Sequence, residues 1–443
     1  MNQNNRITFT PALKHCILPL LLSFTLASCK TLGTLSASRD LSNVSNELVL
    51  EINKFTYTIA NEHDQFYSFI GVRALAMVHL AIHDIFNSRT AQYKTYHFKG
   101  SAPKIDPLAA SITATKTILT EAYPDRKDTI AMVCEAWLQN IPHTSNRSEA
   151  TAFGERLANN LIVFRKNDGH RKQGNYTPMT KPGNYRYTPG YDWVLKPDFS
   201  VARPFTLDSL TQFRSPAPPS IASQAYAESF EQVKTFGKKN SGARTTDQTD
   251  YAHWWAEFGE HSWNRIGRIT ARKKALPIVA ANRMFALLNM NLYDLYLASL
   301  ESKYHYDTWR PYTAIKNAAL DGNTKTRGDR NWKPEMVTPP WPEYPSAHAA
   351  TGAAGAEILT HIYGTAKVSF AMQSTTALPN SKTRYYSDLD EAANECADSR
   401  IMNGYHFGFA TEEGKRQGRA IAKHTIKHFL NPNRYTDIRY GQK

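Results

Sequence analysis

The chain has 443 residues, 41% of them hydrophobic and 21% charged, which excludes a wholly disordered chain and allows a large buried core. Lysine and arginine outnumber aspartate and glutamate by 53 to 39, so the formal net charge is +14. No basic run or nucleic-acid-binding motif accompanies this excess, and we therefore expect no nucleic-acid partner. Scattered solvated side chains explain most of the charge, and the remainder favours anions that enter a cleft.

The first 28 residues carry the pattern of a secretory signal. Arg6 and Lys14 precede an apolar run over residues 16–27, which is too short to span a bilayer as a stable helix. The run leads into Leu-Ala-Ser-Cys, which resembles the lipobox of bacterial lipoproteins, in which the cysteine is lipidated and becomes the first residue. An ordinary signal peptide followed by a chance cysteine is the alternative.

We accordingly expect residues 1–28 to be a lipoprotein signal peptide, Cys29 to be the lipidation site and residues 29–45 to be a tether. The mature protein would be exported and held by a lipid anchor on a bacterial membrane, facing the periplasm or the exterior. No later segment reads as a membrane span. For the remaining cysteines, Cys134 and Cys396, the sequence allows either a disulfide or two buried free thiols.

Helical periodicity dominates the chain from residue 69 onward. Dense apolar residues over 69–86 predict a buried helix, and amphipathic patterns separated by proline and glycine predict others. There is no internal repeat and no clear alternating strand pattern, so the predicted fold is all-α, with residues 46–435 as a single helical domain. The further helices are predicted over residues 108–121, 127–140, 148–166, 246–259, 273–300, 303–320, 346–363, 388–402 and 408–429.

Residues 167–220 differ from the rest of the domain. They are rich in glycine, proline, tyrosine and asparagine and have few periodic apolar residues. This composition predicts a long irregular connection that wraps the surface or frames a cleft, and long connections of this kind are often functional.

The first of three segments with candidate chemistry contains Lys303 and Arg310, and Pro311 follows. Seven residues are close to two helical turns, so the spacing predicts that both cations lie on one face of the helix expected over 303–320. Two aligned cations on a mostly apolar face repel each other unless an anion lies between them. The alternative is a solvated charged stripe.

The second segment is a proline-rich run over residues 339–345 that leads into Ser346, Ala347 and His348 and opens a helix of small residues. A helix N-terminus presents free N–H groups and the positive end of the helix dipole, which together form an anion site. The hydroxyl of Ser346 adds a donor. The alternative is that Ser346 only caps the helix and that His348 lies on the surface.

The third segment contains Arg400 and His406, whose spacing of six residues does not fit one helical face. Gly404 allows the chain to turn between them, so that both side chains can point inward. Two buried charged groups without an anion would be costly. The alternative is a pair of unrelated polar residues at a helix end.

Taken in order, the patterns Lys-x6-Arg-Pro, Pro-Ser-x-His and Ser-Arg-x5-His resemble the three-part signature of the vanadium-dependent haloperoxidases and of the related type 2 phosphatidic acid phosphatases and bacterial acid phosphatases. Residues 309–315, 339–346 and 406–414 look like the haloperoxidase branch, as does the helix that contains His79 and Asp84. The resemblance is patchy and runs from about residue 65 to about residue 425.

The resemblance implies a helical bundle that binds vanadate and oxidises halide with hydrogen peroxide, with a small organic acceptor as a further partner. His406 would bond vanadium through its ring nitrogen, and His348 would be the acid–base residue. Donors to the oxyanion would be Lys303, Arg310, Arg400, Ser346 and the backbone N–H of Ala347.

Two other classes of function stay open. In a phosphatase of the same superfamily no cofactor is needed: His406 would attack the phosphorus of a phosphomonoester and His348 would protonate the leaving group. The absence of multiple membrane spans argues against the integral lipid phosphatases. A non-catalytic lipoprotein that binds an anion is the third possibility.

Three positions bear on the choice of halide. Ala347 stands where the family usually has glycine, which limits the backbone that would hold the oxyanion. Leu300 stands where a chloride-oxidising fungal member has tryptophan, and Trp341 keeps an aromatic ring in the expected halide pocket. We therefore expect bromide or iodide to be oxidised before chloride. His305, Asp307 and Cys396 are expected to pack beside the motifs and not to be catalytic.

Overall fold

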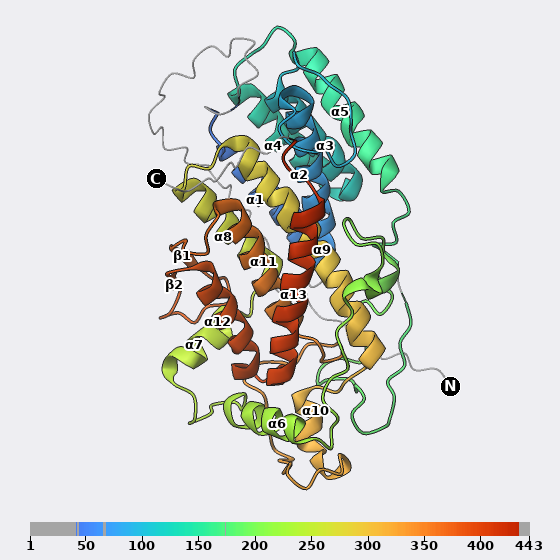
Figure 1. Ribbon diagram of the computed structural model, residues 1–443, viewed down its shortest axis with the longest axis vertical. Helices are drawn as coiled ribbons and strands as arrows, with labels where there is room; N and C mark the ends of the chain where they lie inside the picture. Colours follow the sequence, from blue (N-terminus) through green and yellow to red (C-terminus); the bar gives the residue numbers. More distant parts are fainter. Residues whose placement is uncertain (1–40, 42–43, 65–67, 173, 434–443) are drawn as a thin grey trace, which may run out of the picture. The chain divides into compact units, whose positions relative to one another are not determined.

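The computed structural model describes residues 41, 44–64, 68–172 and 174–433 (Figure 1). The expected signal peptide, Cys29 and nearly all of the tether lie outside these residues. The described residues all belong to one compact unit, Arg39–Lys443.

A 29-residue helix, α9 (Ile278–Tyr306), forms the centre of the fold and is buried on almost every face. A helix that is apolar all round must be covered by other helices, and five others pack against α9 along its length. These helices are α1 (Glu47–Asp64), α2 (Ser68–Thr90), α8 (Gly259–Lys273), α11 (Ala347–Tyr363) and α13 (Gly408–His428).

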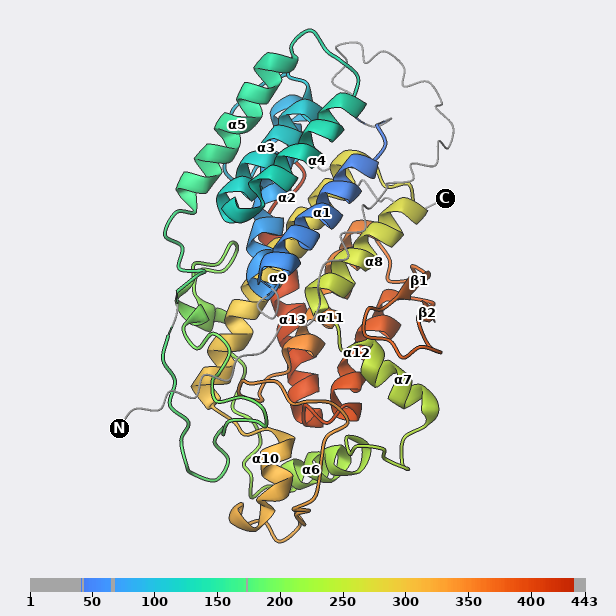
Figure 2. The same cartoon turned by 180° about the vertical axis from the view of Figure 1, so that it is seen from behind.

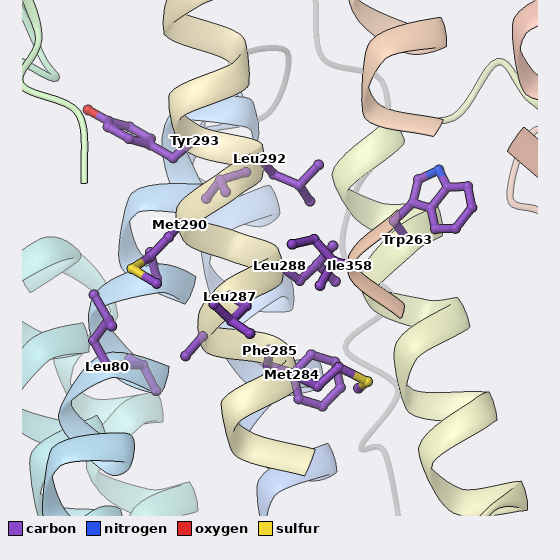
Figure 3. Close-up of a cluster of buried hydrophobic side chains, with 14 of the residues drawn as sticks. Leu80, Trp263, Met284, Phe285, Leu287, Leu288, Met290, Leu292, Tyr293 and Ile358 are labelled. Carbon is purple, nitrogen blue, oxygen red and sulfur yellow. The ribbon is translucent and has the colours of Figure 1, made fainter. Parts of the chain in front are cut away.

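The core lies where these helices meet (Figure 3). Leu287 and Leu288 of α9 are completely buried, and so are Leu80 of α2, Trp263 of α8 and Ile358 of α11. Burying an apolar side chain of this size stabilises the fold by about 1.5–3 kcal/mol. The core therefore makes a rigid frame, and the last turn of α9 projects from it towards the candidate site.

The first part of the domain adds α3 (Pro107–Ala122), α4 (Lys127–Asn140) and α5 (Arg147–Phe164) at one end of the bundle (Figures 1 and 2). A single-turn helix, η2 (Pro124–Arg126), joins α3 to α4. Helix α3 begins at the side chain of Asp106, which accepts the backbone N–H groups of Leu108 and Ala109.

Among the described residues, the segment Phe69–Thr90 of α2 is long and apolar enough to cross a membrane by length and composition, which the sequence analysis did not anticipate. It is entirely buried within the protein, and core helices of soluble proteins can have the same length and composition.

The segment between α5 and α6 (Gln224–Phe236) is irregular, as predicted, and contains only the short helices η3 (Phe199–Val201) and η4 (Leu210–Phe213). Buried carboxylates hold it to the bundle. Both oxygens of Asp294 on α9 accept backbone N–H groups, those of Phe205 and Thr206, each at 2.6 Å. The connection is therefore held in place and forms one wall of the cavity described below.

The remaining elements lie around the carboxyl-terminal helices. They are α7 (Thr246–Trp254), α10 (Pro311–Lys316), η5 (Ala318–Leu320), α12 (Leu389–Met402), β1 (Phe370–Gln373) and β2 (Thr383–Tyr386). The strands pair antiparallel, with Phe370 opposite Tyr386 and Gln373 opposite Thr383.

The all-α prediction is confirmed, but several of its details are wrong. The helix expected over 246–259 ends at Trp254, and α1, α6 and most of α8 were not predicted. The strands were missed because each has only four residues, too few for an alternating pattern to be distinct. Cys134 and Cys396 are buried free thiols, so the alternative of a disulfide is excluded.

Candidate active site

Lys303 lies in the last turn of α9 and is completely buried. Its ammonium group donates to the backbone carbonyls of Pro342 and Glu343, at 3.0 and 2.8 Å. Burial, reinforced by the neighbouring charge of Arg310, holds the pKa of Lys303 well below its ordinary value. A nearby anion would reverse that shift, because it would stabilise the charged form.

The predicted helix over 303–320 is wrong. Helix α9 continues through Lys303 to Tyr306 and ends at Asp307, which has a left-handed backbone with φ 48°. Arg310 follows in extended conformation, because a residue before proline is pushed out of the helical region, and Pro311 begins α10. Lys303 and Arg310 therefore do not share a helical face.

Arg310 still reaches the same site, from the turn between α9 and α10. Its Nε donates to the carbonyl of Trp341 at 2.8 Å, and its Nη1 approaches the carbonyl of Tyr405 and the Nε2 of His406, at 3.0 and 3.1 Å. Its Nη2 is buried and has no hydrogen-bond partner in the structure. A buried guanidinium donor without an acceptor is costly, and an oxyanion would supply the acceptor.

Ser346 is the N-cap of α11, and Ala347 is the first residue of the helix. The hydroxyl oxygen of Ser346 accepts the N–H of Ala349 at 3.4 Å, so Ser346 caps the helix, which was the alternative reading of this residue. The hydroxyl proton remains available to an acceptor. Ala347 lines the cavity, and its backbone N–H is among the first of the helix, which have no partner within the helix.

His348 lies in the first turn of α11 and lines the cavity, so the surface alternative for this residue is wrong. Its Nε2 lies 3.0 Å from the carbonyl oxygen of Glu257, in the link between α7 and α8. Because a carbonyl can only accept, Nε2 carries the proton and Nδ1 has the lone pair. Burial, with the charge of Arg400 as the next cause, lowers the pKa of His348 to about 3.

Arg400 comes from the end of α12 and lines the same cavity. Its Nη2 donates to the carbonyl of Trp255 at 2.8 Å, and its Nε donates to the hydroxyl of Ser399 at 3.1 Å. The turn that follows contains Gly404 at φ 81°, as the sequence predicted, and it brings His406 back towards Arg400.

His406 is buried in the cavity wall with a different partner on each ring nitrogen. Nδ1 lies 2.9 Å from Oε1 of Glu343, and Nε2 lies 3.1 Å from Nη1 of Arg310. Burial is the main cause that holds the pKa of His406 well below its ordinary value, and Arg310, Lys303 and Arg400 add to it. The ring is therefore neutral at neutral pH and keeps a lone pair.

Ala347, His348, Arg400 and His406 line a cavity of about 270 Å³, whereas Lys303, Arg310 and Ser346 are not among its lining residues. Arg400, His348, His406 and the start of α11 form its polar side. Trp341 lies in its wall, as predicted, and its ring centroid is 5.7 Å from the ammonium nitrogen of Lys303. The other wall is largely aromatic and aliphatic: Phe69, Tyr191, Leu195, Phe258, Tyr296, Val337, Pro339 and Tyr405.

Charge is unbalanced around this cavity. Lys303, Arg310 and Arg400 are buried, and the carboxylate whose charge raises the pKa of both Lys303 and Arg310 is that of Glu343. Burial lowers the pKa of Arg310 to about 10 and also lowers that of Arg400. Three buried cations whose charges all act on His406, a histidine with a lone pair, fit a bound oxyanion such as vanadate or phosphate.

Several residues of the site were missed by sequence reasoning. Glu343 could have been noticed, because it is an acidic residue enclosed in an apolar proline-rich run. Phe69, Tyr191 and Tyr296 gave no local signal, because they come from distant segments that only the packing of the bundle brings together. Asp307 and Cys396 take structural roles, Asp307 at the end of α9 and Cys396 with its thiol 3.6 Å from the carbonyl of His348.

Comparison with known proteins finds similar chains among the vanadium haloperoxidases. Residues 283–434 match the family model of the VCPO second helical-bundle domain, a range that includes all three motifs. The vanadium chloroperoxidase of Curvularia inaequalis is 24% identical over an alignment of 401 residues, gaps included, which covers 72% of this chain. This part of the chain is therefore similar to the second helical-bundle domain of that family model. The chain spans 64% of the length of the Curvularia protein.

Solved structures of vanadium haloperoxidases share the fold. The first bacterial vanadium-dependent iodoperoxidase superposes with a TM-score of 0.76 at 22% identity, over 89% of this chain and 99% of that one. A bacterial vanadium-dependent chloroperoxidase in its holo form gives a TM-score of 0.64 at 15% identity, over 88% of this chain and 93% of that one. At these identities the likeness establishes the helical fold of the family.

Proposed function

We propose that this protein is a vanadate-dependent haloperoxidase that oxidises halide with hydrogen peroxide. The observation that carries the proposal is the environment of His406. This residue lines the cavity, and its Nε2 accepts a hydrogen bond from Arg310 and so carries the lone pair of the ring. Lys303, Arg310 and Arg400 are buried around it. The match of residues 283–434 to the family model and the similar fold of a bacterial iodoperoxidase support it.

Vanadate bound in this cavity would supply the chemistry, by activating hydrogen peroxide for attack by a halide. His406 would bond vanadium through Nε2, and Lys303, Arg310 and Arg400 would neutralise the oxygens of the anion. The hydroxyl of Ser346 and the N–H of Ala347 would donate at the start of α11. His348 would hold or release a proton at Nδ1, the nitrogen that its bond to Glu257 leaves with a lone pair.

The apolar wall supports the other expected partners. Phe258, Tyr296 and Trp341 exclude water from the polar side and leave room for a halide and for a small organic acceptor. We propose iodide or bromide before chloride. Trp341 supports this order with its aromatic ring, and Leu300, near the end of α9, supports it because its side chain is smaller than the tryptophan of the chloride-oxidising fungal member. A bacterial iodoperoxidase is also among the similar structures.

The expected export and lipid anchor at Cys29 belong to the proposal as well. The signal-like pattern of residues 1–28 supports them. A protein that starts after Cys29 therefore serves for the assays below.

The deciding measurement is halide oxidation by hydrogen peroxide, before and after addition of orthovanadate, beside hydrolysis of a chromogenic phosphomonoester. We expect iodide and bromide oxidation that depends on vanadate and falls to background in His406→Ala, because the direct bond to vanadium is lost. The matched control is His424→Ala. His424 is half-buried in α13, contacts the carbonyl of Thr206 and does not line the cavity, so this variant should keep full activity.

Release of phosphate that vanadate inhibits, without halide oxidation, would contradict the proposal and point to a phosphatase in the same cavity. Binding of vanadate with neither reaction would leave a protein that only binds an anion.

A further inference from the structure

We propose that Glu343 is a positioning residue for His406: its carboxylate fixes the tautomer and the orientation of the ring, so that the lone pair of Nε2 faces the oxyanion site. This inference rests on the proposed function, since it concerns the residue that would bond vanadium.

The hydrogen-bond chemistry of the two ring nitrogens decides the tautomer. A guanidinium group can only donate, so Nε2 of His406, at 3.1 Å from Nη1 of Arg310, must be the acceptor. The proton of the neutral ring then sits on Nδ1, and Oε1 of Glu343 accepts it at 2.9 Å. Each partner demands the same tautomer, and it is the one that a metal ligand bound through Nε2 requires.

Glu343 is itself held rigidly. Its side chain is completely buried, and Oε1 also accepts the backbone N–H of Phe407 at 3.0 Å, which fixes the carboxylate against the residue that follows His406. Its backbone N–H donates to the carbonyl of Thr308 at 2.9 Å. Pro342 and Pro345 flank this segment and restrict its backbone.

Glu343 also contacts both His406 and Lys303. The backbone carbonyl of Glu343 accepts the ammonium group of Lys303 at 2.8 Å, so one residue contacts the end of α9 through its main chain and His406 through its side chain. The second oxygen, Oε2, is buried without a hydrogen-bond partner. A carboxylate kept in so costly a position is better explained by the ring that it orients than by stability alone.

The test compares Glu343→Gln with the wild-type protein in two measurements. The first is the ¹⁵N NMR tautomer of His406 in the protein without vanadate, assigned with His406→Gln. We expect the proton on Nδ1 in the wild type and a loss of this preference in Glu343→Gln, because the amide can present either a donor or an acceptor to the ring.

The second measurement is equilibrium binding of orthovanadate, where we expect the dissociation constant to rise about 10- to 100-fold, the usual cost of losing a partner behind a metal ligand. Glu343→Asp keeps the charge but has a shorter reach, and it should lie between Glu343→Gln and the wild type.

Asp168→Asn is the matched control. Asp168 is a buried carboxylate that contacts a histidine in the same way, with Oδ1 2.7 Å from Nδ1 of His170, but it does not contact His406. This variant should bind vanadate as the wild type does. If it weakens binding as much as Glu343→Gln, the effect is a general loss of structure and the inference is overturned.

A folded Glu343→Gln protein with the wild-type tautomer and an unchanged dissociation constant would also overturn the inference. If Glu343→Gln does not fold, the same comparison is made with Glu343→Asp, and wild-type values in that variant overturn it. A wild-type protein that binds no vanadate would refute the proposed function, whereas the tautomer measured without vanadate would still decide the role of Glu343.

Discussion

At the scale of single residues, the site depends on groups that are costly to bury. Nη2 of Arg310 and Oε2 of Glu343 are both buried without a partner, and the two side chains contact opposite nitrogens of His406. Each group would be destabilising by itself. The site therefore exchanges some stability for a cavity that is already shaped and charged for an anion before the anion arrives.

Ala347 is the residue at which a single methyl group should alter binding. It is 4% exposed, lines the cavity and stands where the family usually has glycine. We expect Ala347→Gly to tighten vanadate binding by about two- to tenfold, because glycine allows the first amide of α11 to approach the anion more closely. The measurement is the dissociation constant by equilibrium titration.

The same substitution should lower the free energy of unfolding by about 0.5–1 kcal/mol, the usual cost of glycine in place of alanine in a helix. Ala349→Gly, two residues later and also buried, is the control for that cost. Weaker vanadate binding in Ala347→Gly than in this control would contradict the prediction.

At the scale of helices, the start of α11 is placed by its contact with α13. Gly414 and Gly418 of α13 face the backbone of α11, and a Cβ on Gly418 would lie 2.2 Å from the carbonyl oxygen of Ala350. Only residues without a side chain allow so close an approach. The two glycines thus set the position of Ser346 and His348, although neither contacts the cavity.

Gly414→Ala tests this contact. The added Cβ would lie 2.3 Å from the carbonyl oxygen of Ser346, a backbone atom that cannot move alone. We expect the free energy of unfolding to fall by about 1–3 kcal/mol, as for other overpacked cores, and vanadate binding to weaken because the start of α11 is displaced. Chemical denaturation and equilibrium titration measure the two effects.

Gly242→Ala is the control for Gly414→Ala, since nothing lies within 4 Å of a Cβ at that exposed position. It should change neither quantity. Unchanged vanadate binding in a destabilised Gly414→Ala protein would show that α11 is not placed in this way.

At the scale of the whole molecule, basic side chains line two hollows near the cavity. A hollow of about 580 Å³ next to α10 is lined by Arg186, Lys316 and Arg330 and by no acidic residue. A second hollow shares Lys316 with it, adds Lys239 and Lys333, and shares Val337 with the active-site cavity. Its one carboxylate, Glu335, is paired with Arg244.

This arrangement predicts that anions approach the cavity faster than diffusion alone would bring them. We expect the combined variant Lys316→Glu, Arg330→Glu and Lys333→Glu to bind vanadate about tenfold more slowly at low ionic strength, with the difference shrinking as salt screens the charges. Stopped-flow fluorescence measures the association rate.

The control reverses three exposed cations at the other end of the bundle, Lys116, Lys127 and Arg156 on α3, α4 and α5 (Figures 1 and 2). It changes the net charge by the same amount. If both variants slow binding equally, net charge alone is responsible and the hollows have no special part.

The sequence determined the chemistry of this site. Lysine, arginine and histidine at fixed spacings, with a proline-rich entry and a small-residue helix, indicated an oxyanion site because those residue types have few other reasons to be buried together. It also determined the all-α class and the irregular connection, since helical periodicity and its absence are local properties of the chain.

The tertiary structure alone decided how these residues meet. Lys303 and Arg310 lie on different segments, because Asp307 ends α9 and Pro311 begins a new helix. Arg310 still contacts His406, and Lys303 contacts the backbone carbonyl of Glu343, whose side chain contacts His406. Glu343, Phe69 and Tyr296 join the site through packing between segments far apart in the chain. Contacts of this kind leave no periodic signal, because they depend on how whole helices cross and not on the spacing of neighbouring residues.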